Sequence, residues 1–146
     1  MIYLLRHGDA EDGDGDDAAR RLTPKGKRQA RAAGRAPAAR GAKIDACLAS
    51  PRVRATETAR LACEALGVEP EIAAELGGGP FDALALSAGR GVVMLVGHEP
   101  DLSTEVARLT GARVRMRKGG LAIVDGSTLL ALLGPDELIA IAATPG

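Results

Sequence analysis

The sequence has very few aromatic residues. It contains no tryptophan, and its one tyrosine and one phenylalanine are Tyr3 and Phe81. A hydrophobic core must therefore be built from aliphatic side chains, and the hydrophobic content of 46% is ordinary for a globular protein. A chain of 146 residues has the length of one domain and can bury a core without disulfides or metals, so we expect a single domain over residues 1–146.

The sequence also has only two cysteines and no net charge, and each of these features excludes a class of protein. Cys47 and Cys63 are the only cysteines, too few and too isolated for a disulfide framework or a zinc site. The 19 basic and 19 acidic residues give no net charge, hence no overall field that attracts nucleic acid or anionic membranes. No signal-type segment or long apolar run is present, so we expect a soluble cytoplasmic protein.

The sequence does contain alternating strand-like and helix-like segments. Apolar runs predict strands at residues 1–5, 46–49 and 92–96, and a hairpin of strands 121–124 and 128–133. A first helix is predicted from Thr23-Pro24 toward Arg40, with Pro37 kinking or ending it. Further helices are predicted from Ser50-Pro51 to about Leu66, over residues 81–88, and around residues 102–109. The pattern predicts an α/β fold, a three-layer sandwich with a mostly parallel central sheet and helices on both faces.

The two histidines occur in matching contexts. His7 follows the first predicted strand and precedes Gly8, and His98 follows the strand at 92–96 and precedes Glu99-Pro100. In open α/β sheets, ligands bind at the carboxyl ends of the strands. Either histidine alone could be an ordinary turn residue, but two matched placements favour a site.

Arg54 supplies an independent indication. It lies four residues before Thr58, on the stripe of the predicted helix that faces the core. A cation on a buried face needs a partner, and an anion at the start of the helix would provide one. The alternative is an ordinary pair with Glu57, while Arg52 and Arg60 are interpreted as surface charge.

Arg6, His7, Arg54 and His98 together suit a phosphoryl group. Arginine binds phosphate oxygens through two parallel hydrogen bonds, and phosphoryl transfer depends mainly on such positioning and charge stabilisation. Neighbouring arginines also disfavour protonation of His7, and the neutral imidazole is the nucleophilic form. We therefore predict a phosphate pocket with His7 as nucleophile.

Four motifs resemble the histidine phosphatase superfamily, which has the phosphoglycerate-mutase-like fold. In chain order they are Arg6-His7-Gly8, Leu22-Thr23-Pro24-Lys25-Gly26, the stretch Ser50–Ala59, and Gly97-His98-Glu99-Pro100. The short length and Arg6-His7-Gly8-Asp9 resemble the SixA-type phosphohistidine phosphatase branch. The resemblance covers the chain from residue 2 to about 110.

The resemblance implies a hydrolase with a covalent phosphohistidine intermediate on His7, from which water releases inorganic phosphate. Arg6, Arg54 and His98 would hold the phosphoryl oxygens, with Gly8 beside them, and no metal or organic cofactor is implied. The substrate would be protein phosphohistidine, making a phosphorylated signal-transduction protein the partner. The alternatives are a small-molecule phosphomonoesterase and a non-catalytic phosphate-binding regulator.

The sequence departs from the family pattern at the position of the proton donor. Many family members carry an acid where this chain has glycines 77–79. The candidates left are Glu75, Glu11 and Glu99.

Two charged segments have other interpretations. The acidic loop at 11–17 does not fit an EF-hand, because its sixth and twelfth positions are Asp17 and Thr23, so we interpret it as a solvated loop that guards the pocket mouth. Arg113, Arg115, Arg117 and Lys118 alternate as in a strand, which indicates a solvated face or a docking site for an acidic partner.

Overall fold

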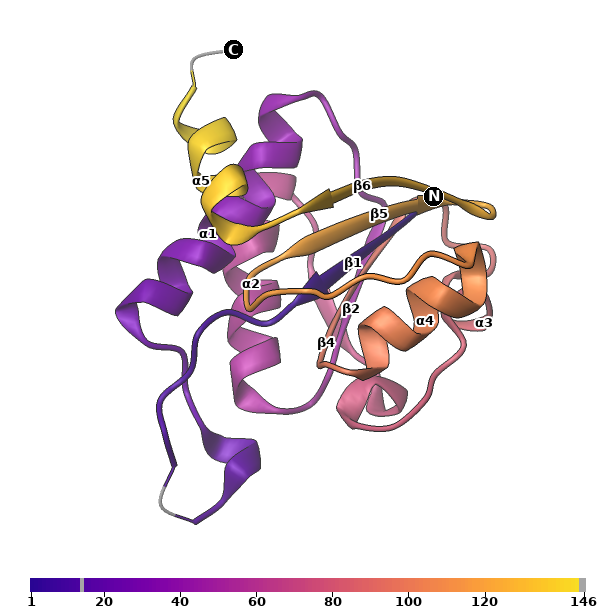
Figure 1. The fold of residues 1–146 in the computed structure, drawn as a ribbon. Coiled ribbons are helices and arrows are strands. Elements are labelled where there is room, and N and C mark those ends of the chain that lie inside the picture. Colours follow the sequence, from indigo (N-terminus) through magenta and orange to yellow (C-terminus); the bar gives the residue numbers. More distant parts are fainter. Residues whose placement is uncertain (14, 145–146) are drawn as a thin grey trace.

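The computed structural model describes residues 1–13 and 15–144, and at its centre lies a six-stranded sheet (Figure 1). The strand order is β3-β2-β4-β1-β5-β6. The strands are β1 Ile2–Arg6, β2 Ala46–Ala49, β3 Pro70–Ile72, β4 Val93–Gly97, β5 Leu121–Asp125 and β6 Thr128–Leu133. Neighbours from β3 to β1 pair in parallel, whereas β5 pairs antiparallel with both β1 and β6. The predicted α/β fold with a mostly parallel sheet is confirmed.

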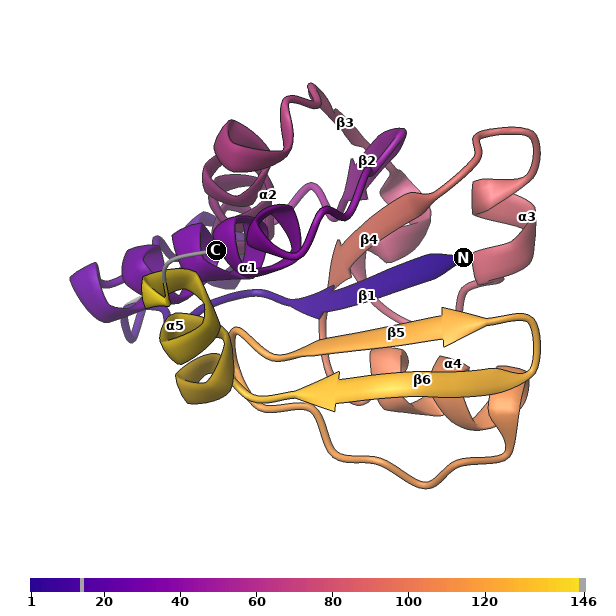
Figure 2. The same ribbon diagram turned by 90° about the horizontal axis from the view of Figure 1, so that it is seen from above.

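Helices cover both faces of the sheet (Figure 2). They are α1 Pro24–Ala39, α2 Val53–Leu66, α3 Ala83–Ser87, α4 Asp101–Thr110 and α5 Pro135–Ala143, with 3-10 turns η1 Asp17–Ala19 and η2 Ala74–Gly77. Side chains of β1 alternate between two cores: Tyr3 and Leu5 pack with α1, α2 and α5, and Ile2 and Leu4 pack with α3 and α4. Each core is mostly aliphatic.

Helix α1 begins as the sequence predicts. The hydroxyl of Thr23 accepts a hydrogen bond from the amide of Gly26 at 3.0 Å, and Pro24 occupies the first turn. Pro37 does not end the helix, which continues to Ala39. The carbonyl of Pro37 there accepts from the amides of Arg40 and Ala42, both at 3.0 Å.

Helix α2 begins later than predicted. Its first residue is Val53, and Ser50 does not cap it; the Ser50 hydroxyl accepts from the Arg52 amide at 3.2 Å and bonds to His98. The predicted stop is confirmed, because Gly67 adopts a left-handed conformation just after Leu66. The side chain expected to start the helix is thus engaged with a histidine instead.

The remaining elements agree in part. The predicted hairpin is confirmed as β5 and β6. The C-terminal helix α5 was not predicted, although Gly134-Pro135 followed by two acidic residues is a helix-start pattern. Residues 113–118 alternate as predicted but belong to no strand. No helix among residues 1–13 and 15–144 is long and apolar enough to cross a membrane.

Candidate active site

Three neighbouring parallel strands deliver the candidate residues to one edge of the sheet. His7 follows β1, His98 follows β4, and Ser50 follows β2, while Arg54 lies in the first turn of α2. The ring centroids of the two histidines lie 5.2 Å apart, and both rings are buried. The amide of His7 also donates to the carbonyl of Gly97 at 3.2 Å, which ties the two strand ends together.

The tautomer of His7 follows from its contact with the backbone. Its Nδ1 lies 2.7 Å from the carbonyl oxygen of Gly8, which can only accept, so Nδ1 carries the proton and Nε2 keeps its lone pair. Burial lowers the pKa of His7 to about 3; the Gly8 bond opposes this, and the charges of Arg54 and Arg6 add to it. His7 is therefore neutral near pH 7, with Nε2 available as a nucleophile.

The loop after His7 packs between helices α1 and α2. The amide of Gly8 donates to the hydroxyl of Thr58 at 3.1 Å, and that hydroxyl donates to the carbonyl of Arg54 at 2.7 Å. On the other side, a Cβ on Gly26 would collide with the carbonyl oxygen of Asp9. The position of His7 is thus coupled to both α1 and α2.

Ser50 orients the second histidine. Its hydroxyl oxygen accepts from the Arg52 amide and lies 2.7 Å from Nε2 of His98, to which the hydroxyl can donate its proton. That arrangement favours a proton on Nδ1 of His98, a buried atom without a partner in the described chain. Burial, followed by the charges of Arg54 and Arg52, lowers the pKa of His98 to about 4.

Arg6 is the second residue with an unused donor. Its NH1 donates to the carbonyl of Met116 at 3.0 Å, whereas its buried Nε has no partner. Within residues 1–13 and 15–144, Arg6 Nε and His98 Nδ1 are the two buried side-chain nitrogen or oxygen atoms without one. Unpaired buried donors are costly, and an anion between these elements would satisfy them.

Arg54 is buried, as predicted, but its partner is Asp17 rather than Glu57. Its NH1 donates to the Asp17 carbonyl at 2.9 Å, and its NH2 lies 3.2 Å from the Asp17 carboxylate. Glu57 instead accepts from the Leu22 amide at 3.2 Å. The loop carrying Asp17 reaches across α2, a contact that helical spacing cannot reveal.

The interpretation of Arg52 as surface charge is wrong. Arg52 donates to the carboxylate of Asp17 and, through Nε, to the carbonyl of Gly77 at 2.7 Å. A hydrogen bond from Arg20 and the charge of Arg54 lower the pKa of Asp17. A carboxylate with a lowered pKa is a poor proton donor, so Asp17 acts as an anionic cover on the arginines.

The three candidate proton donors lie in different places. Both carboxylate oxygens of Glu99 accept backbone bonds, from the amides of Ser103 and Met116 at 2.8 and 3.2 Å. Glu75 is exposed in η2 and lines a separate hollow that includes Arg90. Glu11 is exposed on the loop before η1. Glu99 is thus committed to the backbone, and Glu75 faces elsewhere.

The acidic loop provides no cluster of potential metal ligands in the described chain. The carboxylate of Asp9 accepts from the Thr23 hydroxyl at 2.8 Å and lies 3.6 Å from the amine of Lys118. Asp14 lies outside the described residues. The loop touches the pocket through Asp17, in line with a guarding position at its mouth.

Sequence reasoning assigned no site role to Ser50, Thr58, Asp17 or Met116. Ser50 carries the same signal as the histidines, because it directly follows a strand of the parallel sheet. The contacts of Asp17 and Met116 depend on loops, which have no periodicity to interpret.

Comparison with known proteins identifies relatives. The family profile described as "Histidine phosphatase superfamily (branch 1)" matches residues 2–82. No curated protein sequence matches significantly.

Solved structures resemble most of the chain. The protein histidine phosphatase SixA, complexed with tungstate, is 25% identical with a TM-score of 0.81, covering 94% of this chain and 98% of its own. The SixA-type protein of Agrobacterium tumefaciens is 24% identical with a TM-score of 0.82, covering 92% and 97%. Phosphoserine phosphatase of Entamoeba histolytica, in complex with 3-phosphoglyceric acid, is 16% identical with a TM-score of 0.67, covering 94% and 98%. The last two likenesses, below 25% identity, show the fold alone.

Proposed function

The chain belongs to the histidine phosphatase superfamily, and from that premise we propose that this phosphatase acts through a phosphohistidine intermediate on His7. In the first step, Nε2 of His7 bonds to phosphorus while the bond from phosphorus to the leaving group breaks. In the second step, water attacks phosphorus, the bond to Nε2 breaks, and inorganic phosphate and a proton leave. Residues 1–146 act as one domain in this proposal.

The observation that carries the proposal is the pair of unpartnered buried donors beside the nucleophile. Arg6 Nε and His98 Nδ1 are buried nitrogen atoms without a hydrogen-bond partner in the described chain, and Arg6 directly precedes His7, whose Nε2 keeps its lone pair. A phosphoryl group supplies acceptor oxygens to the donors and phosphorus to the nucleophile. A regulator that only bound phosphate would need the donors but not the free Nε2.

Arg54 supplies further charge, and Asp17 controls access to it. The guanidinium of Arg54 already holds one anion, the Asp17 carboxylate, which is itself half exposed. A phosphoryl group can replace that carboxylate, because a dianion gains more from the cluster than a single carboxylate does. The pocket is therefore adapted to anions of higher charge.

The proposed substrate is phosphohistidine on a protein. The likeness to SixA supports it, as does the lack of a well-placed acid among Glu11, Glu75 and Glu99. A phosphoester expels an alkoxide and gains about 100- to 10,000-fold from a general acid. Imidazole leaves more readily and can take its proton from water. The free, buried thiols of Cys47 and Cys63 suit a cytoplasmic location, which we also propose.

The test compares a phosphohistidine protein with phosphoserine, a phosphorylated sugar and a phosphoglycerate, all with a chelator present. We expect kcat/KM to favour the phosphohistidine protein by at least about tenfold, or about 1.4 kcal/mol of transition-state discrimination. Equal or better efficiency on a small phosphoester would replace this substrate with a small-molecule one. Loss of all activity on chelation, restored by a divalent metal, would contradict the metal-free mechanism.

A further inference from the structure

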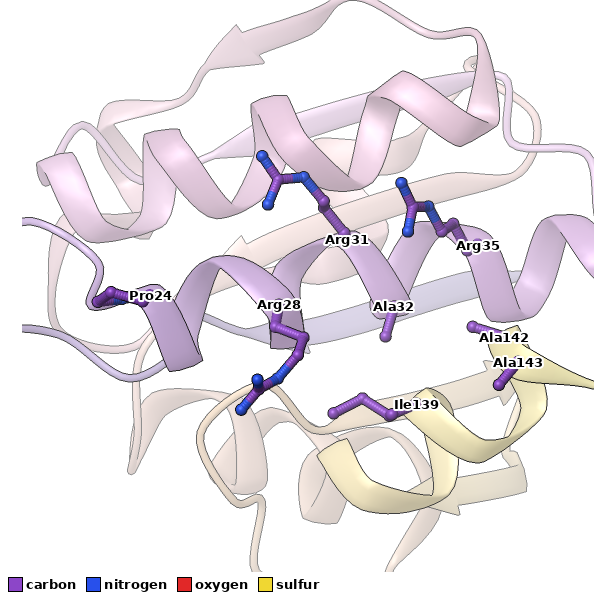
Figure 3. Close-up of a pocket in the computed structure, with 8 residues that line it drawn as sticks. All are labelled: Pro24, Arg28, Arg31, Ala32, Arg35, Ile139, Ala142 and Ala143. Atoms are coloured by element: carbon purple, nitrogen blue, oxygen red, sulfur yellow. The ribbon is translucent and has the colours of Figure 1, made fainter.

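Two basic grooves flank helix α1, and they differ in their relation to the candidate active site. The first, the Arg115 groove, has a volume of about 350 Å³, and its lining includes Arg6. The second, the Arg31 groove, has a volume of about 470 Å³ and lies between α1 and α5 (Figure 3). The Arg31 groove contains none of the four candidate site residues. The Arg115 groove therefore shares Arg6 with the candidate active site, whereas the Arg31 groove shares no residue with it.

The Arg115 groove is rich in cations. Besides Arg6, it is lined by Lys25, Arg115, Arg117 and Lys118, with Asp9 and Asp136 as its acidic members. Asp9 is engaged with Lys118, whereas Arg115 and Arg117 form no ion pair with any described residue. Because the whole chain has no net charge, this positive charge is a local feature of the pocket's border.

The segment that carries these arginines is fixed to the catalytic strand. Met116 is buried, its carbonyl accepts from Arg6 and its amide donates to Glu99, so Arg115 and Arg117 on either side of it are exposed. The amide of Gly119 donates to the carbonyls of both Arg6 and His7, at 3.1 and 2.9 Å. These backbone hydrogen bonds fix the position of Arg115 and Arg117 relative to His7.

On the opposite border of the pocket, the arginines are already paired with a carboxylate. Asp17 contacts Arg52 and Arg54 at the start of α2, which follows β2, whereas the Arg115 segment leads into β5. Strands β4 and β1 lie between β2 and β5 in the sheet, so the two borders flank the histidines from opposite sides. Arg115 and Arg117 form no such pair with a described residue, so a partner with acidic residues on one side of its phosphoryl group gains more when that side faces the Arg115 groove.

We propose that the Arg115 groove docks an acidic segment adjoining the phosphorylated histidine of a protein substrate. The inference rests on the proposed function and adds to it the charge and orientation of the partner. Carboxylates of that segment pair with Arg115 and Arg117 while the phosphoryl group reaches His7. Such pairs at the rim of a site lower KM and are weakened by salt.

The test uses two synthetic phosphohistidine peptides, flanked on one side by four glutamates or by four glutamines, and phosphoramidate as the small substrate. The wild type is expected to prefer the glutamate peptide by at least about fivefold in kcat/KM at low salt, mainly through KM. R115E/R117E is expected to abolish that preference and leave phosphoramidate hydrolysis within about twofold. R115Q/R117Q should give an intermediate preference.

The matched control is R31E/R35E. It makes the same change in net charge in the Arg31 groove, where both side chains point to the same side of α1 (Figure 3). This variant is expected to retain the preference for the glutamate peptide. Equal loss in both charge-reversal variants would mean general electrostatic attraction and would overturn the docking site, as would a wild type without preference.

Binding of the unphosphorylated glutamate peptide, measured by fluorescence anisotropy, separates this proposal from the proposed function. One outcome is that no phosphorylated substrate is hydrolysed, while the wild type binds this peptide and R115E/R117E does not. That outcome supports the docking site and contradicts the phosphatase mechanism. If all three substrates are hydrolysed without peptide preference or binding, the mechanism stands and the groove fails. Melting temperatures verify that each variant is folded.

Discussion

The hydroxyl of Ser50 lies 2.7 Å from Nε2 of His98, and its oxygen accepts a hydrogen bond from the amide of Arg52. The serine thereby links the end of β2 to the end of β4. When the hydroxyl donates to Nε2, Nδ1 is the nitrogen of neutral His98 that carries the proton. Ser50 is thus a positioning residue, which acts through the histidine beside it.

Replacing Ser50 tests this positioning. We expect Ser50→Ala to lower kcat at least about tenfold, or about 1.4 kcal/mol, because the His98 tautomer is no longer fixed. Ser50→Thr, which keeps the hydroxyl, should recover part of the loss. Nitrogen NMR of the His98 ring should report a changed tautomer in Ser50→Ala alone. Wild-type kcat in a folded Ser50→Ala protein would refute the role.

The covalent intermediate can be trapped. Rapid quenching with labelled substrate should leave phosphate on His7, stable in base and labile in acid, as expected for a phosphoramidate. His7→Ala should abolish both the label and turnover, while Arg54→Ala should weaken phosphate binding. Label on Ser50, Thr56 or Cys47 would exclude the proposed nucleophile.

Asp17 should compete with phosphate for the arginines. We expect Asp17→Asn to tighten inhibition by inorganic phosphate about two- to fivefold, the range for an exposed ion pair. The control is Asp12→Asn, which removes the same charge from an exposed position of the same loop. If Asp17→Asn weakens phosphate binding instead, the carboxylate holds Arg54 in position and does not compete.

The lowered histidine pKa values predict a dependence of stability on pH. His7 and His98 have pKa values of about 3 and 4 in the folded chain, against about 6.5 when unfolded. The unfolded state therefore binds more protons below pH 6.5, and the free energy of unfolding falls as pH is lowered toward 4. Each histidine contributes a slope of up to about 1.4 kcal/mol per pH unit.

Denaturant titrations between pH 7 and 5 measure this slope while most carboxylates remain ionised. His7→Gln and His98→Gln should each have a shallower slope than the wild type. An unchanged slope in both variants would mean that neither histidine is buried in its neutral form.

Gly26 should tolerate no side chain. A Cβ there would collide with the carbonyl oxygen of Asp9, so Gly26→Ala must displace either α1 or the loop after His7. Overpacking costs about 1–3 kcal/mol, and we expect a melting temperature lower by at least about 3 °C together with reduced kcat. The control Lys27→Ala, at an exposed position of the same turn, should alter neither. A fully active, stable Gly26→Ala would contradict the close contact.

The sequence predicted every strand of the sheet except β3, most helices and the edge where the histidines lie, because each depends on local patterns. Strand ends place His7 and His98, and helical spacing places Arg54 on a buried face. The partners of these residues were not predictable in the same way. Asp17, Arg52 and Met116 meet the pocket through loops whose paths depend on the folded whole. Ser50 was misinterpreted because a serine before proline fits a helix cap as well as a histidine contact.

The strand order also determines when the pocket can exist during synthesis. Strand β1 leaves the ribosome before the other strands, yet its two neighbours in the sheet, β4 and β5, begin only at residues 93 and 121. Until residues 93–97 and 121–125 have emerged, the segment bearing His7 has no lateral hydrogen-bonding partner. Assembly of the pocket is therefore a late event of high contact order. A chain that ends before residue 93 carries His7 but has neither His98 nor the strands that position the two histidines.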